Sequence, residues 1–246
     1  MTAAGMPKRP DYGIDAPGVL ITLLSIGVLG QILGLFAPPL TIGPVTILFG
    51  VPMQIAGGIF LLQGLLMFIY VKWGKFRHRD RMLAQVPWTG NERLLDIGTG
   101  RGLLLIGAAR RLTTGRAVGI DIWSTKDLSG NAIERTQANI ALEGVGDKVE
   151  LRTEDASKLT FPNASFDVVM SNLCIHNIPK QTGRDQACRE IARVLRPGGV
   201  AVISDYKLTK KYAEVLAGER LSVEWRGPFW RDTFPPLKMF VARKPS

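Results

Sequence analysis

Cysteine is scarce in this sequence. Only Cys174 and Cys188 occur among the 246 residues, so neither a framework of disulfides nor a cysteine-ligated structural zinc site is indicated. Charge is absent over one long stretch, because no Asp, Glu, Lys, Arg or His lies between Asp15 and Lys72. The surface of an ordinary soluble domain does not tolerate such a run, which instead predicts a segment inside a lipid bilayer.

The uncharged run is long enough for two helices that cross a membrane. Residues 17–36 are all uncharged, and a hydrocarbon core of about 30 Å needs roughly 20 helical residues. Turn-like segments follow at 37–39 and 42–44, and residues 45–71 then supply a second apolar stretch in which Pro52 predicts a kink. Tyr70 and Trp73 stand at its end, where aromatic side chains favour the membrane interface. We therefore predict a helical hairpin at 17–72, preceded by an N-terminal tail at 1–16.

The placement of the positive residues gives the hairpin an orientation. The formal net charge is +10, but the positive residues form no single patch, so no nucleic-acid partner is predicted. Lys8 and Arg9 precede the first span and a basic cluster follows the second, which places both ends in the cytoplasm. Attraction to anionic lipid headgroups is a secondary expectation. The basic cluster consists of Lys72, Lys75, Arg77, Arg79 and Arg81.

Two alternatives accompany the hairpin. The first apolar run could be a signal peptide, but it exceeds the usual core of about 7 to 15 residues and a second span follows it. Glycines within the spans could let the two helices approach each other closely, or could support a homo-oligomer, although glycine is common in membrane helices. These glycines are Gly27, Gly30, Gly34, Gly57 and Gly64.

Beyond the hairpin the pattern changes. A short basic helix at 75–85, closed by Pro87 and a polar turn, predicts a linker at 73–90. Strand-like runs then alternate with helical patterns, which predicts an α/β domain at 91–246 with a doubly wound, mostly parallel sheet covered by helices on both faces. The strands are expected at 93–97, 117–121, 148–151, 166–170 and 200–205, and the helices at 103–112, 130–143 and 182–195.

The first strand runs into a glycine-rich turn, LLDIGTGRG at 94–102. Glycines there let the backbone pass close to a ligand at the carboxyl end of the strand, although a turn that needs them only for its own geometry is the simpler alternative. The spacing is not G-x-G-x-x-G, and the G-K-[ST] ending of a phosphate-binding loop is missing, so both NAD and ATP are disfavoured. Asp121 ends the next strand about twenty residues later, where a carboxylate can accept hydrogen bonds from ribose hydroxyls.

The acidic residue and the G-x-G-x-G turn resemble the first motif of the class I S-adenosylmethionine-dependent methyltransferases, and the resemblance extends over about residues 91–244. It implies a seven-stranded, Rossmann-like sheet with S-adenosylmethionine as the cofactor. Asp96 would then hold the methionine amino group, directly or through water. The backbone of the turn would line the cofactor at Gly98, Thr99, Gly100 and Gly102.

The resemblance also assigns the nucleoside half of the cofactor. Asp121 would bind the ribose and Ile122 would pack on the adenine, a role that Trp123 could share unless it only covers an apolar edge of the fold. Asp155 would accept a hydrogen bond from the exocyclic amine and the Ala156 amide would donate one to the ring, with a plain surface turn as the alternative. The sequence RPGG at 196–199 matches the family's turn before the fifth strand.

Residues 171–177, SNLCIHN, follow the fourth strand at the edge where ligands of open α/β sheets bind. We assign Asn172 to the cofactor site. Similar small-molecule and quinone C-methyltransferases carry a His in this segment, so His176 could orient the acceptor or remove its proton, with a packing role as the alternative. Cys174 is predicted to be a small buried residue, since methyl transfer needs no thiolate.

These features predict a membrane-anchored methyltransferase with two spans and a catalytic domain on the cytoplasmic face. A small lipophilic acceptor is expected, such as a quinone precursor, an isoprenoid or a phospholipid headgroup, because the domain has no large insertion that could form a lid and the hairpin enters just before its first strand. The aromatic segment 225–230 either shapes that opening or forms the turn between the last two strands. A nucleotide-dependent oxidoreductase and a non-catalytic membrane protein that retains a cofactor-binding fold are the alternatives. No metal is predicted.

Overall fold

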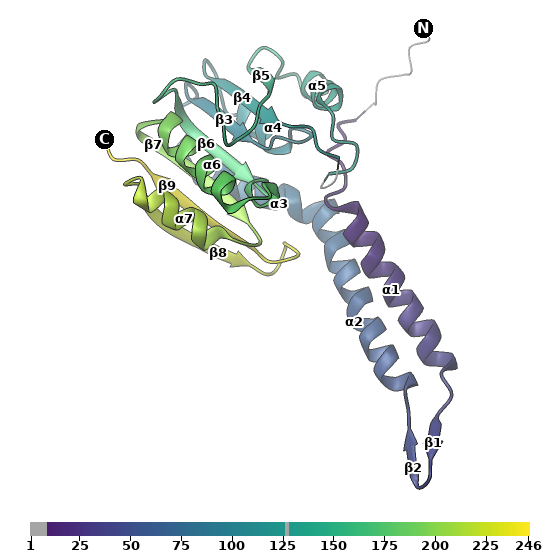
Figure 1. The fold of residues 1–246 in the computed structure, drawn as a ribbon. Coiled ribbons are helices and arrows are strands. Elements are labelled where there is room, and N and C mark those ends of the chain that lie inside the picture. Colours follow the sequence, from purple (N-terminus) through teal and green to yellow (C-terminus); the bar gives the residue numbers. More distant parts are fainter. Residues whose placement is uncertain (1–8, 126–127) are drawn as a thin grey trace.

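A long helical hairpin projects from a layered α/β domain (Figure 1). The computed structural model describes residues 9–125 and 128–246. The hairpin consists of α1 (Pro17–Phe36) and α2 (Gly50–Ile69), joined at the far end by the two short strands β1 (Leu40–Ile42) and β2 (Val45–Ile47). Both helices are long and apolar enough to cross a membrane, and only 11% of the most apolar window in the first and 28% in the second is buried.

Glycines bring α1 and α2 into close contact. A Cβ atom added to Gly30 would lie 2.9 Å from the Cα of Gly57, and one added to Gly27 would lie 2.9 Å from the backbone nitrogen of Leu61. No larger residue fits at these positions without a shift of the helices, as is typical of closely packed membrane helices. The glycines that we considered for a homo-oligomer therefore pack within one chain.

The second span differs from the prediction at both ends. It begins at Gly50 instead of 45, because residues 45–47 pair with β1 across a turn at Gly43. Pro52 falls in the first turn of α2, where amide groups have no acceptor within the helix, so the predicted kink is not needed. The helix then continues through a π-helical turn at Tyr70–Gly74 into α3 (Lys75–Leu83), so the predicted linker helix extends the second span.

The sheet of the α/β domain has seven strands in the order β5-β4-β3-β6-β7-β9-β8. The first five in this order are parallel, and β9 runs antiparallel between β7 and β8. The predicted doubly wound, mostly parallel sheet is thus confirmed, except that the RPGG segment lies within β7 instead of forming a turn before it. The strands are β3 (Arg93–Ile97), β4 (Arg116–Asp121), β5 (Val149–Thr153), β6 (Phe166–Asn172), β7 (Leu195–Asp205), β8 (Ser222–Phe229) and β9 (Leu237–Arg243).

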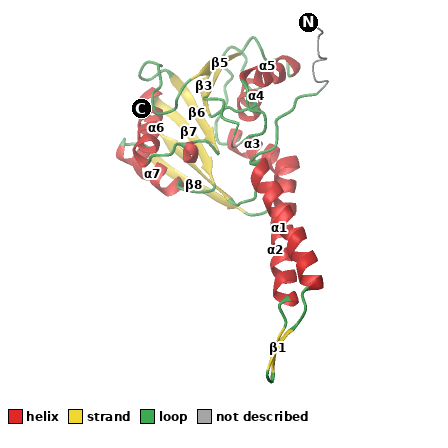
Figure 2. Cartoon of the chain, turned by 45° about the vertical axis from the view of Figure 1, so that its right-hand side comes forward, coloured by secondary structure: helices red, strands yellow, loops and turns green. Residues whose placement is uncertain are grey.

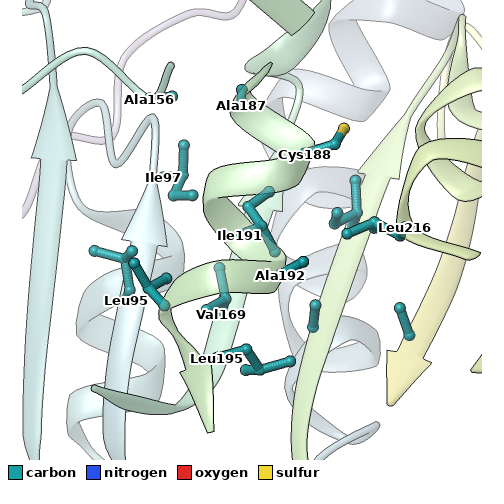
Figure 3. Packing of buried hydrophobic residues seen from close by; sticks show 14 of the residues in the cluster. Leu95, Ile97, Ala156, Val169, Ala187, Cys188, Ile191, Ala192, Leu195 and Leu216 are labelled. Carbon is teal, nitrogen blue, oxygen red and sulfur yellow. The ribbon is translucent and has the colours of Figure 1, made fainter. Parts of the chain in front are cut away.

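Helices cover both faces of the sheet (Figure 2). Successive strand residues point to opposite faces, so Leu95 packs with α6 and α7 while Leu94 packs with α3, α4 and α5. Figure 3 shows Ile191 and Ala192 of α6 between the strands that carry Leu95 and Val169 on one side and Leu216 of α7 on the other. The predicted helices are confirmed with shifted ends, and α7 was not predicted. The helices of the domain after α3 are α4 (Leu103–Ala109), α5 (Ile133–Leu142), α6 (Gln181–Val194) and α7 (Thr209–Gly218), and a 3-10 turn, η2, lies at Ile175–Asn177.

The N-terminal segment is not a free tail where the structure describes it. The backbone of Asp11 donates to the Asn139 side chain at 2.9 Å, and the Tyr12 hydroxyl donates to Glu143 at 2.7 Å. The Lys75 ammonium group binds the carbonyl oxygens of Tyr12 and Gly13 at 3.0 and 2.6 Å. Residues 9–16 therefore form a strap that ties the start of α1 to the α/β domain, because the domain's side chains satisfy its backbone polar groups.

Candidate active site

The carboxyl ends of β3, β4, β6 and β7 meet at the edge of the sheet from which the hairpin projects, and they surround one cavity of about 630 Å³. Ligands of open α/β sheets bind at such an edge. Ten of the eleven residues that we predicted for the site line this cavity: Asp96, Gly98, Thr99, Gly100, Asp121, Ile122, Asp155, Ala156, Asn172 and His176. Gly102 does not. It has φ +83° at the start of α4, where an added Cβ would lie 3.1 Å from Ile106 and from Thr136, so its role is to begin the helix.

The glycine-rich turn is held against the neighbouring strand. The amides of Gly98 and Thr99 both donate to the Ile120 carbonyl, at 2.9 and 3.0 Å. Gly98 has φ +75°, and a Cβ atom there would lie 2.3 Å from the Cys174 sulfur. Only glycine satisfies both conditions. Burial, followed by the charges of Asp121 and Asp96, raises the pKa of the Cys174 thiol far above its ordinary value, so Cys174 packs against the turn as a neutral group.

Asp96 is the most strongly perturbed acid of the site. It is 2% exposed, and its Oδ2 atom has no hydrogen-bond partner in the part of the chain that the structure describes. Burial, with the nearby charge of Asp121 adding to it, raises the pKa of Asp96 from 3.8 to about 7. A buried, unpartnered carboxylate of this kind is suited to a positively charged ligand group, which would supply both a hydrogen bond and a counter-charge.

Asp121 is held in place by three donors. Its Oδ2 accepts from the Gly100 amide at 2.8 Å, and its Oδ1 accepts from the Trp123 amide at 2.6 Å and from Asn131 at 3.2 Å. Ile122, at 66% exposure, lines the cavity next to it. The Trp123 indole instead donates to the Thr153 hydroxyl at 2.8 Å and does not line the cavity. The geometry thus favours Ile122 alone for stacking.

The segment after β5 forms a local turn and also lines the cavity, which are the two roles that we considered for it. Asp155 forms a local turn, since its Oδ1 accepts from the amide and the hydroxyl of Ser157, each at 2.8 Å. Asp155 and the buried Ala156 also line the cavity. A carboxylate oxygen has room for further donors, so the turn does not prevent Asp155 from binding a ligand.

His176 faces the same cavity from η2, and its partner was not predicted. Its Nδ1 lies 2.9 Å from Oδ2 of Asp205, the last residue of β7, and its ring packs edge-on against Tyr206 at 4.9 Å. A carboxylate oxygen accepts hydrogen bonds, so Nδ1 is assigned as the donor to Asp205, and Nε2 is then the ring nitrogen left to accept one. The position of Asp205 at a strand end, as for Asp96 and Asp121, is the sequence signal that would have found it.

The other end of the cavity is apolar and was also not predicted. It is formed by Val19 of α1, by Met67 and Tyr70 at the end of the second span, by Phe234 of the β8–β9 connection and by Leu237 at the start of β9. Tyr12 and Asp15 of the strap close one side. The segment 225–230, by contrast, does not line this cavity, because it belongs to β8 up to Phe229.

The chain matches the family described as "Methyltransferase domain" over residues 95–203. It is 36% identical over 141 residues to the 27-O-demethylrifamycin SV methyltransferase of Amycolatopsis mediterranei, covering 57% of this chain and 48% of that protein. It is 32% identical over 130 residues to a demethylmenaquinone methyltransferase of Lactiplantibacillus plantarum, covering 52% of this chain and 51% of that protein. Residues 95–203 of the α/β domain are thus a methyltransferase domain of the class I S-adenosylmethionine-dependent kind. The chain spans about half the length of these two curated relatives.

The fold of this chain agrees with solved structures. An O-methyltransferase family protein from Burkholderia thailandensis superposes with a TM-score of 0.59 at 15% identity, covering 93% of this chain and 72% of that one. The family implies S-adenosylmethionine as the cofactor, and the cavity has suitable groups for it. Buried polar atoms without a hydrogen-bond partner among the described residues line it: Asp96 Oδ2, Thr99 Oγ1, Asn131 Oδ1 and Asn172 Oδ1.

Proposed function

We propose that this methyltransferase methylates a small lipophilic acceptor at the cytoplasmic surface of a membrane. The observation that carries the proposal is that one cavity joins the polar strand ends around Asp96 and Asp121 to the apolar residues Val19 and Met67 at the near end of the hairpin. A polar ligand and an apolar one can therefore meet inside it. If the hairpin spans a bilayer, the apolar end of the cavity lies where a lipophilic molecule could enter from the membrane.

S-adenosylmethionine, when bound, supplies an electrophilic methyl group on a sulfonium leaving group. We assign its ribose to Asp121, its amino group to Asp96 and its adenine to the surface between Ile122 and Ala156. The unpartnered Oδ2 of Asp96 supports this arrangement. Because the leaving group is already activated, the main work left to the chain is to hold the acceptor near attack distance and exclude water.

His176 is our candidate for the base that removes the acceptor's proton. The Asp205 carboxylate holds the imidazole with Nδ1 at 2.9 Å, which leaves Nε2 free to accept a proton from an acidic O–H, N–H or C–H group. Nε2 of His176 would take up the proton that an acceptor gives up as it receives the methyl group that bound S-adenosylmethionine would supply. Asp205 acts through His176 as a positioning residue.

The hairpin is proposed to span the membrane, with both of its ends in the cytoplasm. Few of its residues are buried, unlike a core helix of a soluble protein, and α1 packs along α2, unlike a signal sequence that is removed. The basic residues on the π-helical turn and α3 begin with Lys72, directly where the uncharged run ends, as the positive-inside rule expects. A homo-oligomer stays a prediction.

The acceptor class follows from the apolar end of the cavity. One relative is named a demethylmenaquinone methyltransferase, which is in keeping with a quinone-type acceptor. An isoprenoid or a lipid headgroup has the same amphiphilic character and would fit the same opening. None of these observations favours the nucleotide-dependent oxidoreductase that the sequence left open.

The proposal is tested by incubating the full chain with methyl-labelled S-adenosylmethionine and with either membrane or soluble extracts. We expect label in a product that partitions into organic solvent, only with the membrane extract. The Asp121→Ala variant should lose the product, whereas Asp147→Ala, which removes an exposed carboxylate outside the cavity, should retain it. Label only in the soluble extract would contradict the lipophilic acceptor. Cofactor binding without transfer to either extract would favour the non-catalytic alternative.

A further inference from the structure

Two exposed arginines share an open recess beside the hairpin. Arg77 lies on α3 and Arg231 in the β8–β9 connection, and together with Phe229 and Trp230 they line a cavity of about 590 Å³ separate from the active site. Neither guanidinium group has a carboxylate partner within the ranges that the structure describes. Two unpaired positive charges therefore face the same small volume.

Contacts within the chain hold the residues around the recess in place. Arg81 forms an ion pair with Asp232 at 2.5 Å and its guanidinium lies 4.1 Å from the centre of the Phe229 ring. The backbone of Asp232 lies so close to Gly74 that a Cβ there would be 2.0 Å from its carbonyl oxygen. The connection is thus fastened to the π-helical turn, and the charge of Arg81 is neutralised within the chain while Arg77 and Arg231 stay unpaired.

The recess lies level with the end of the second span. Trp73, three residues after Tyr70, is 60% exposed and Trp230 is 72% exposed, although tryptophan is usually buried in a soluble domain. In Figure 1 the end of β8 points toward the near end of α2, in agreement with the contact between Asp232 and Gly74. Exposed tryptophans with arginines at this level are typical of the headgroup region of a membrane.

We infer that the recess lined by Arg77, Trp230 and Arg231 binds the phosphate-bearing headgroup of an anionic phospholipid. This inference rests on the proposed membrane placement of the hairpin. Arginine guanidinium groups bind phosphate oxygens in a bidentate manner, and anionic lipids attract basic residues near the cytoplasmic surface. The tryptophan rings would lie among the headgroups and the upper parts of the acyl chains.

The bound lipid has a consequence for the active site. The connection that carries Trp230 and Arg231 continues to Phe234 and Pro235, which line the active-site cavity at its apolar end. A headgroup on the recess would therefore give the domain a second attachment to the membrane. It would hold the apolar opening against the bilayer surface, where a lipophilic acceptor is concentrated.

The test uses the full chain in non-ionic detergent, titrated with short-chain phosphatidylglycerol while tryptophan emission is recorded. A saturable change is expected, with much weaker binding of short-chain phosphatidylcholine and none of inorganic phosphate. A Trp230→Phe variant should lose most of the change, which assigns the signal to the recess. Equal binding of both lipids, or equally tight binding of inorganic phosphate, would overturn the inference.

Charge variants make the test specific. The double variant Arg77→Gln/Arg231→Gln should bind phosphatidylglycerol roughly 10- to 30-fold more weakly, as two lost lipid contacts predict. The matched control is Arg220→Gln/Arg243→Gln, which removes two exposed charges at the other end of the β8–β9 ribbon, where Ser222 pairs with Arg243. It should bind as the parent chain does. An equal loss of phosphatidylglycerol affinity in both double variants would show that net charge alone governs the binding, and this would overturn the inference.

The failure of this inference is distinguishable from a failure of the proposed function. A chain that methylates a lipophilic product but binds phosphatidylglycerol no better than phosphatidylcholine contradicts only the lipid site. A chain that prefers phosphatidylglycerol but transfers no methyl group contradicts only the proposed activity.

Discussion

Replacement of Asp96 by Asn should make the protein more stable while removing its cofactor affinity. Asp96 is 2% exposed and its Oδ2 atom has no partner among the described residues, so ionisation is costly in the folded chain. Its pKa is raised from 3.8 to about 7, a difference of about 3 units. At 1.36 kcal/mol for each unit, an ionised Asp96 lowers the free energy of unfolding by up to about 4 kcal/mol.

The raised pKa of Asp96 determines the pH range over which the free energy of unfolding changes. Between pH 4 and 7 the folded chain holds the Asp96 proton more tightly than the unfolded chain, so this group lowers the free energy of unfolding as the pH rises through that window. Asparagine has no such proton. We therefore expect Asp96→Asn to exceed the unfolding temperature of the parent chain only slightly at pH 5 and by several degrees at pH 8.

Calorimetry at the two pH values completes the test. In the parent chain, S-adenosylmethionine should bind more weakly below pH 7, by up to tenfold for each pH unit, because Asp96 must lose a proton to hold the cofactor's amino group. The Asp96→Asn variant should bind at least tenfold more weakly at pH 8 and show little pH dependence. A variant that binds as tightly as the parent, or is less stable than the parent at pH 8, would contradict this role of Asp96.

Three further changes test other parts of the site. His176→Gln should lower kcat by about 100- to 10,000-fold with an unchanged cofactor Kd, and Asp205→Asn should lower kcat less and shift the pH–rate profile. An equal loss of cofactor affinity in both variants would instead indicate a packing role for His176. In denaturant unfolding, Gly98→Ala should lower the free energy of unfolding by more than about 2 kcal/mol, because the new Cβ meets Cys174. The control Gly144→Ala, at φ +64° with open space around it, should lower it by only about 1 kcal/mol. Lys75→Met should release the strap and speed cofactor dissociation about tenfold in stopped-flow measurements, since three oxygen contacts are lost; an unchanged rate would show that the strap does not cover the site.

The parts of the fold that depend on local patterns were predictable. The strand and turn at 93–102 have an unbroken apolar run followed by glycines, and the structure places them as expected. The helix α7 was missed because TKKYAEVLAG at 209–218 has a weak apolar face that only Tyr212, Ala213 and Leu216 reveal once buried. The second span was extended too far toward its start, since VTI at 45–47 suits a strand as well as a helix.

The unpredicted parts of the site depend on contacts between distant segments. His176 and Asp205 are separated by 29 residues and meet only because β6 and β7 end side by side. The strap at 9–16 reaches Asn139, 128 residues away from Asp11. No periodicity or spacing encodes such contacts, although the placement of polar residues at strand ends narrows the search.

A lipophilic acceptor is proposed to reach the cofactor through the apolar end of the cavity, and two variants at adjacent positions test this route. Val19 lines that end, whereas an added side chain at Gly18 would meet nothing within 4 Å. An Asp at either position lies in the first turn of α1, where helices tolerate a negative charge. With the full chain in lipid bilayers and labelled S-adenosylmethionine, Val19→Asp should reduce organic-soluble label at least tenfold and Gly18→Asp should not, with equal cofactor affinity in both. Equal activity of the two variants, or label found only in water-soluble products, would contradict this route.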